Sequence, residues 1–339
     1  MLRVTSQAPS AIPANRRRFP ATRISVVAFT GSLLLTACGG GDADGKAAAG
    51  EESAAHAVRK QAEAAQAAAP KKVTSGPALD FDLTPGAGKA VGTGQPVSLE
   101  FKKPVKNKPA VEKALSVTAS TPTEGSWGWV TTPAGLDRLD WRPRDPWKPE
   151  TDVTVKGTLT TVDPGGAHFD RDLNRTFRIG RDQQLTADLD THRLIVKRDG
   201  KQVKSIPMSG GEPVKNRASR PGTFAIKSRE EKVHMTSASV GGPKAYDVIV
   251  NWGMRFSDSG GYLHQATDNT QRFVGNTNIS AGCVGMTPED AKWLYDHTLL
   301  GDLVTVQGKE ATGELGGPGN GYADWSVTYD RWKSKSALK

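Results

Sequence analysis

The sequence predicts a mainly β protein with two domains. The first is an antiparallel β-sandwich of immunoglobulin-like architecture, and the second is β-rich with one helix. Short runs of β-branched and aromatic residues, separated by Pro, Gly and Asp, recur between residues 77 and 180. A second series follows and includes Asp199-Gly200, the dipeptide that best supports a type I′ hairpin.

The segment 77–180 has the pattern of half-buried strands. Apolar side chains alternate at Val153 and Val155, and the spacing of successive runs suits an antiparallel sandwich. We find no histidine, cysteine or carboxylate cluster here that is organised for chemistry. We therefore interpret this domain as a spacer or positioning domain, with Trp141 and Trp147 in its core or at a domain interface.

Residues 181–308 form the second predicted domain. Its expected strands lie within the segments RLIVKRDGKQVKS, GTFAIKS, KVHMTS, AYDVIVNW, GYLHQA and DLVTVQG. The one clear helix is expected to run from Thr287 to about residue 298, because Thr287 is a suitable N-cap and Pro288 fits the first turn. Gly301 is expected to end this helix.

Residues 1–38 have the three parts of an export signal: basic residues, an apolar stretch and small residues. The ending Leu35-Thr36-Ala37-Cys38 resembles a bacterial lipobox, in which the cysteine becomes the lipid-modified first residue. The apolar run is shorter than the roughly 20 residues that cross a bilayer, which favours a lipoprotein over a transmembrane helix. Arg16-Arg17-Arg18-Phe19 also resembles a twin-arginine signal, and both export routes stay open. We expect a lipid anchor on the extracytoplasmic side of the cell membrane, facing the cell wall.

Two segments lie outside the predicted domains. Residues 39–76 are rich in Ala, Gly and charge, with almost no large apolar residue, so we expect a flexible tether. Residues 309–339 form a C-terminal tail that contains Trp325 and Trp332. The formal charge of +9 falls to +4 without residues 1–37, which hold five arginines and no acid. This balance predicts no nucleic-acid partner.

Cys283 is the candidate nucleophile. With Cys38 assigned to lipid, Cys283 has no disulfide partner, and a free thiol in an exported protein is usually reactive. Small neighbours at Ala281 and Gly282 open the main chain to a substrate. A redox sensor is disfavoured because the chain offers no resolving cysteine.

A thiol with a pKa of about 8.5 needs a neighbouring base or positive potential to act as a nucleophile. His264 is our preferred base, and His234 is the rival in the same domain. A purely structural role for His264 stays open on the residues alone. The chain has no HExxH, CxxC or GxSxG pattern, so we expect no metal, no cofactor and no serine nucleophile.

Residues 279–286, Ile-Ser-Ala-Gly-Cys-Val-Gly-Met, with His264 19 positions before Cys283, resemble the active-site signature of L,D-transpeptidases of the YkuD fold. That signature is usually a histidine, a spacer, then [ST]-H-G-C-[VIL]-[RN]. The resemblance extends over residues 77–335, including Trp141-Arg142-Pro143 and the segment 290–297. These residues look like the actinobacterial type with an immunoglobulin-like domain ahead of a YkuD-type catalytic domain.

The resemblance implies a cysteine acyltransferase that forms 3-3 cross-links between peptidoglycan stem peptides and is a target of carbapenems. It implies Cys283 as nucleophile, His264 as base and the main-chain carbonyl of Gln265 as the group that orients the imidazole. The remaining roles fall on residues of the motif and the pocket: Ser280, Gly282 and Cys283 around the oxyanion hole, and Tyr246 and Met235 in the substrate pocket, both of which are equally compatible with packing.

Residues 264–280 are expected to form a lid-like loop over the thiol, with Arg272 as a partner for a substrate carboxylate. An ordinary solvated charge is the alternative for Arg272. The chain departs from the family motif at Ala281, where a histidine is usual, and at Gly285, where arginine or asparagine is usual. The competing hypothesis is therefore a peptidoglycan-binding scaffold lipoprotein with weakened or lost activity.

Overall fold

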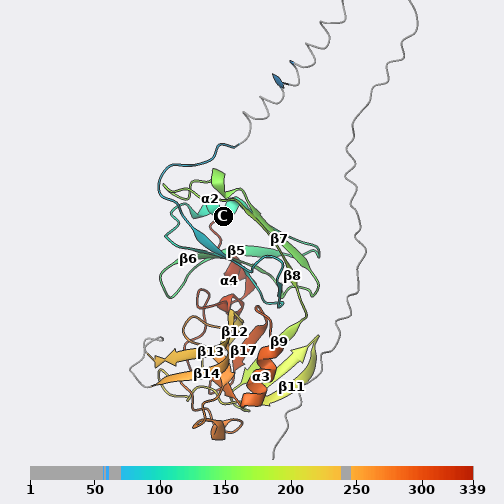
Figure 1. The fold of residues 1–339 in the computed structure, drawn as a ribbon, viewed down its shortest axis with the longest axis vertical. Helices are drawn as coiled ribbons and strands as arrows, with labels where there is room; N and C mark the ends of the chain where they lie inside the picture. The colour runs from blue at the N-terminus through green and yellow to red at the C-terminus, as the bar shows by residue number, and fades with distance from the viewer. Residues whose placement is uncertain (1–55, 57–58, 61–69, 238–245, 339) are drawn as a thin grey trace, which may run out of the picture. The chain divides into compact units, whose positions relative to one another are not determined.

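The computed structural model describes residues 56, 59–60, 70–237 and 246–338. The expected signal segment, Cys38 and most of the expected tether lie outside the described residues. Residues Ala69–Lys339 form one compact unit that contains both β domains (Figure 1). Among the described residues, no helix has the length and apolar character needed to cross a bilayer.

The first domain is a sandwich of two four-stranded sheets, as the sequence predicts. One sheet has the order β1 (Phe81–Thr84), β3 (Val97–Phe101), β6 (Asp137–Pro143) and β5 (Gly125–Thr131). The other has the order β2 (Ala90–Val91), β8 (Leu173–Ile179), β7 (Asp152–Gly157) and β4 (Leu115–Ala119). Val153 and Val155 are both fully buried, because alternate residues of β7 face the other sheet.

The sandwich core also holds the two tryptophans assigned to it from the sequence. The rings of Trp141 and Trp147 stack with their centroids 5.0 Å apart, and Trp147 Nε1 donates to the Gln95 carbonyl at 2.7 Å. Two short helical segments were not predicted, α2 (Lys108–Lys113) and the 3-10 turn η1 (Leu159–Thr161). Asn107 caps α2 by accepting a hydrogen bond from the Ala110 N–H.

The second domain contains two sheets that pack on a shared core. The larger has the order β11 (Lys201–Pro207), β10 (Arg193–Arg198), β9 (Gln183–Asp188), β17 (Leu303–Gln307) and β12 (Gly222–Ala225). The smaller has the order β13 (Ser228–Thr236), β14 (Asp247–Arg255), β15 (Tyr262–Gln265) and β16 (Val284–Met286). Asp199 and Gly200 connect β10 to β11 with φ values of 47° and 75°, which confirms the predicted hairpin.

Helix α3 (Pro288–Asp296) follows β16 directly and packs against β14, β15 and β16. The Thr287 hydroxyl accepts a hydrogen bond from the Asp290 N–H at 3.2 Å, which confirms the predicted N-cap. The predicted end near residue 298 agrees with the C-cap at His297. The predicted role of Gly301 was wrong, because Gly301, with φ of 85°, lies in a separate turn where its N–H donates to the Ile226 carbonyl.

The C-terminal tail contains η4 (Ala323–Ser326), which packs against β12 of the second domain, and α4 (Tyr329–Lys333), which packs against β5 of the first. Trp332 is fully buried, and its Nε1 donates to the Ser126 carbonyl of β5 at 2.9 Å. Trp325 Nε1 donates to the Gly94 carbonyl at 2.8 Å. The tail is therefore an integral part of the folded unit.

Candidate active site

The pairing of β15 with β16 brings the candidate nucleophile and base to one face of the sheet. The strands are parallel, with Leu263 opposite Val284 and His264 opposite Gly285. Leu263 and Val284 are both fully buried in the domain core. Because side chains alternate along a strand, His264 and Cys283 face the other side of the sheet.

The thiol of Cys283 is partly buried in an apolar environment. It contacts a small cluster that includes Val233, Met235 and Val250. The Sγ atom donates a hydrogen bond to the Gly260 carbonyl at 3.3 Å. Burial raises the pKa of the Cys283 thiol to about 11, so the resting thiol is neutral.

The imidazole of His264 is held in one orientation by its own strand. Its Nδ1 lies 2.6 Å from the main-chain oxygen of Gln265. Because a carbonyl only accepts, Nδ1 carries the hydrogen and Nε2 is the free basic nitrogen. Burial lowers the pKa of His264, which keeps the imidazole neutral near pH 7. The Gln265 carbonyl thus makes the contact that the resemblance implies, and no hydrogen bond joins the described atoms of His264 to Sγ.

The rival base, His234, lies on the wrong face of its strand. Val233 and Met235 of β13 point toward Cys283, so the side chain of His234 between them points away. It is exposed, and its Nε2 is 2.6 Å from Asp247 Oδ1. The structure therefore favours His264 over His234 as the base.

The turn before Cys283 is organised by the Ser280 hydroxyl. This oxygen accepts the Gly282 N–H at 3.1 Å and donates to the Cys283 carbonyl at 2.6 Å. Gly282 has φ of 118°, a conformation that favours glycine. Among the described residues, none accepts a hydrogen bond from the Cys283 N–H. Of the main-chain N–H groups at Gly282 and Cys283, which the resemblance places around the oxyanion hole, the Gly282 N–H is thus occupied and the Cys283 N–H is available.

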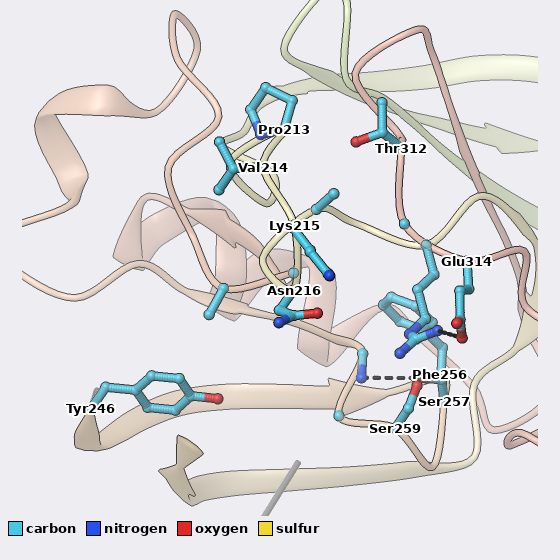
Figure 2. A pocket seen from close by; sticks show the side chains of 17 residues that line it. Pro213, Val214, Lys215, Asn216, Tyr246, Phe256, Ser257, Ser259, Thr312 and Glu314 are labelled. Atoms are coloured by element: carbon cyan, nitrogen blue, oxygen red, sulfur yellow. Dashed lines mark hydrogen bonds and ion pairs between the residues drawn. The ribbon is translucent and has the colours of Figure 1, made fainter. Parts of the chain in front are cut away.

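A pocket of about 430 Å³ lies beside the turn that precedes Cys283, and neither Cys283 nor His264 is among the residues that line it. Gly260, the acceptor of the thiol hydrogen bond, lines it together with Ala281 and Gly282. Figure 2 shows Tyr246 reaching into the pocket from one side and Lys215 and Asn216 from the other. Tyr246 therefore lies where the sequence analysis expects it, whereas Met235 contacts the thiol cluster and does not line the pocket.

The cationic residues of this pocket were missed in the sequence. Arg220 is paired with Glu314 at 3.1 Å, whereas Lys215 has no carboxylate within ion-pair distance among the described residues. Tyr262, two positions before His264 and on the same strand face, was also missed. Burial raises the pKa of Tyr262, and proximity to Cys283 contributes to this shift. Because alternate residues of a strand share a face, the position of Tyr262 two residues before His264 could have indicated that both side chains lie on the same face.

The predicted lid was wrong. None of residues 265–280 lines the pocket. The segment is instead joined to residues 208–210 by main-chain hydrogen bonds. Gly275 donates to the Met208 carbonyl at 3.0 Å, and Ser280 to the Gly210 carbonyl at 2.9 Å. Arg272, in the turn η3 (Gln271–Phe273), lies over the ring of Phe273 and is not part of the pocket.

Comparisons with known proteins agree with this geometry. Residues 182–306 match the L,D-transpeptidase catalytic domain (YkuD) model, and residues 46–163 match a bacterial Ig domain model. The chain is 35% identical over 263 residues to L,D-transpeptidase 2 of Mycobacterium tuberculosis. It is 32% identical over 253 residues to L,D-transpeptidase 5 of the same species.

The chain belongs to the L,D-transpeptidase family. The two alignments cover 75% and 74% of this chain, but only 62% and 55% of these two relatives. Among solved structures, an L,D-transpeptidase from Mycobacterium smegmatis is similar with a TM-score of 0.54 at 29% identity. An L,D-transpeptidase in complex with imipenem is similar with a TM-score of 0.57 at 27% identity. The alignments cover 68% of this chain and 99% of each of these two structures.

The L,D-transpeptidase domain accommodates both departures from the family motif. Gly285 exchanges two main-chain hydrogen bonds with Ser209, at 2.8 and 2.9 Å, so its place in the sheet needs no side chain. A Cβ atom at Gly285 would lie 3.2 Å from the Cβ atom of Ala266. Ala281 is exposed and lines the pocket, so a methyl group stands in the pocket wall where a histidine side chain is usual.

Proposed function

We propose that this protein is a peptidoglycan L,D-transpeptidase that forms 3-3 cross-links through a thioester on Cys283. The observation that supports it most is the shared sheet face of Cys283 and His264, with a pocket of about 430 Å³ lined by Ala281 and Gly282, the two residues before Cys283. The relative that binds imipenem and the catalytic-domain match support the same reaction class.

In the acylation step, His264 Nε2 takes the thiol proton as Sγ attacks the carbonyl between the third residue of a stem peptide and its terminal D-alanine. The S–C bond forms and the electron pair of the carbonyl moves to oxygen. Collapse of this intermediate breaks the C–N bond, and the imidazolium returns its proton to the leaving amine. The neutral thiol and neutral imidazole make this a general-base step.

The Cys283 N–H is our candidate oxyanion donor, because it has no acceptor among the described residues. A donor of this kind contributes about 3 kcal/mol to transition-state stabilisation in comparable sites. Ser280 acts on this donor indirectly, by fixing the turn that aims it. Tyr246 provides one wall of the peptide-binding pocket.

In the second step, a side-chain amine of a neighbouring stem attacks the thioester. His264 accepts a proton from that amine and returns it to the departing sulfur, which restores the neutral pair. Lys215 is our candidate partner for a free carboxylate of the stem peptide, because its ammonium faces the pocket without an ion pair among the described residues.

We further propose that lipid on Cys38 holds the protein in the cell membrane on the extracytoplasmic side, facing the cell wall. The lipobox-like segment 35–38 supports this proposal. Cys38→Ala should move the protein from the membrane fraction to the soluble fraction and abolish labelling by a radioactive fatty acid. Retention of both membrane association and label would contradict the anchor.

The competing candidate is a scaffold that keeps the fold without chemistry, and the motif departures at Ala281 and Gly285 favour it. Incubation of the full chain with imipenem separates the two, because only a reactive Cys283 gains the mass of one imipenem. A parent protein without adduct, under conditions that modify a control L,D-transpeptidase, would favour the scaffold. Ala281→His then tests whether the missing imidazole limits the rate.

A further inference from the structure

We propose that Asp258 is a positioning residue for the catalytic thiol. It fixes the turn Ser257–Gly261, which connects β14 to β15 and carries the Gly260 carbonyl that holds Sγ. Through Asp258, this turn is tied to the C-terminal tail and to the first domain. The inference rests on the proposed role of Cys283 as nucleophile.

The carboxylate of Asp258 is the centre of a polar cluster beneath the turn. Lys227 Nζ lies 2.9 Å from Oδ1 and 3.1 Å from Oδ2. The Gly321 N–H donates to Oδ2 at 3.0 Å, and Arg255 donates to the Asp258 main-chain oxygen at 2.9 Å. The side chain is only 14% exposed, so these charge-assisted hydrogen bonds are shielded from water.

The turn itself is held by the tail on its other side. Ser259 N–H donates to Asn320 Oδ1 at 2.8 Å, and Asn320 Nδ2 donates to Ser259 Oγ at 2.9 Å. A Cβ atom at Gly321 would lie 2.5 Å from the Phe256 carbonyl, so tail and turn are in close main-chain contact. Position 321 requires glycine for this approach.

Arg138 of β6 extends the cluster into the first domain. Its Nη2 donates to the Gly321 carbonyl at 2.5 Å, and its Nη1 is 3.8 Å from Asp258 Oδ2. Arg138 is 1% exposed and is neutralised by Asp140, whose Oδ2 accepts from Nε at 2.8 Å. A set of polar contacts therefore runs from the first domain, through the tail, to Asp258, which lies two residues before the carbonyl that accepts from Sγ.

This arrangement has a direct consequence for reactivity. The Gly260 carbonyl selects one orientation of the thiol, and displacements near 1 Å in such sites cost about 100-fold in rate. Ser257, Ser259 and Gly260 also line the pocket, so the same turn positions substrate and nucleophile together. Loss of the Asp258 carboxylate should therefore loosen Sγ without removing any reacting group.

The test compares acylation by imipenem with alkylation by iodoacetamide in the full chain. Asp258→Ala should lower the acylation rate at least tenfold, because Sγ loses its orientation. It should raise the alkylation rate at a fixed pH, because the thiol is no longer held by the carbonyl. Asp258→Asn keeps an acceptor for the Gly321 N–H and should give intermediate rates. Asn320→Ala should also lower acylation, without leaving a charge unpaired.

Asp188→Ala is the matched control. Asp188 accepts two main-chain N–H groups and the Gln307 amide in a turn of the same domain that does not line the pocket. Asp188→Ala should lower the midpoint temperature of unfolding without changing the acylation rate or the alkylation rate. Unchanged acylation and alkylation rates in Asp258→Ala would overturn the inference. A parent protein that is never acylated would instead contradict the proposed function, and alkylation would still test the position of the thiol.

Discussion

The thiol of Cys283 and the carbonyl of Gly260 lie 3.3 Å apart, so the resting nucleophile is hydrogen-bonded to a main-chain oxygen and not to its base. His264 lies on the same sheet face with a free Nε2. In the proposed mechanism the S–H hydrogen must therefore turn from the Gly260 carbonyl toward His264 Nε2, while the turn Ser257–Gly261 keeps the sulfur in place. In this resting geometry the thiol is neutral, because burial raises its pKa.

The pH dependence of acylation tests whether the Cys283 thiol and the His264 imidazole are both neutral in the resting protein. Because the pKa of His264 is lowered, the parent rate should be constant near neutrality and fall only below about pH 6.5, the ordinary histidine pKa. In His264→Ala the reactive form is the thiolate, whose pKa is raised to about 11. Its acylation rate should be far lower at pH 7 and rise about tenfold per pH unit.

Stopped-flow measurement of imipenem consumption from pH 5 to 10 checks this prediction. His234→Ala should reproduce the parent profile, because His234 faces away from the thiol. A flat profile for His264→Ala at the parent rate would contradict the assignment of the base.

Lys215 should set the affinity for substrates with a free carboxylate. Lys215→Ala removes the pocket's unpaired cation, so the half-saturating concentration of a tetrapeptide stem should rise about tenfold, as for loss of one charge-assisted contact. The maximal rate should change little. Steady-state release of D-alanine measures both quantities.

Arg272→Ala is the matched control for Lys215, because it removes an exposed cation of the same domain that does not line the pocket. It should leave both kinetic parameters at parent values. A rise in the half-saturating concentration in Arg272→Ala but not in Lys215→Ala would restore the sequence-based assignment.

Ser280 should act through the turn that it closes. Ser280→Ala removes two hydrogen bonds, to the Gly282 N–H and the Cys283 carbonyl, and should cost about 1 to 3 kcal/mol in stability. The Cys283 N–H then loses its fixed direction, so acylation should slow about tenfold. Urea denaturation and imipenem kinetics measure the two effects. Ser280→Thr keeps the hydroxyl and should retain most of both, and parent behaviour of Ser280→Ala would contradict the role of the turn.

The sequence predicted the features that depend on local rules. The Asp199-Gly200 hairpin and the Thr287 N-cap follow from turn and capping chemistry, and the motif resemblance placed the Gln265 carbonyl on His264. The roles of Lys215, Gly260 and Asp258 were not predicted, because each depends on a turn meeting a distant segment. The lid prediction failed for the same reason, since the hydrogen bonds of Gly275 and Ser280 to residues 208–210 leave no trace in the sequence pattern.

The central claim is that Cys283 is a reactive nucleophile despite Ala281 and Gly285. Intact-mass measurement of the full chain after incubation with imipenem tests it most directly. We expect the parent to gain the mass of one imipenem and Cys283→Ala to gain nothing. An unmodified parent beside a modified control enzyme, or an adduct that persists in Cys283→Ala, would contradict the claim.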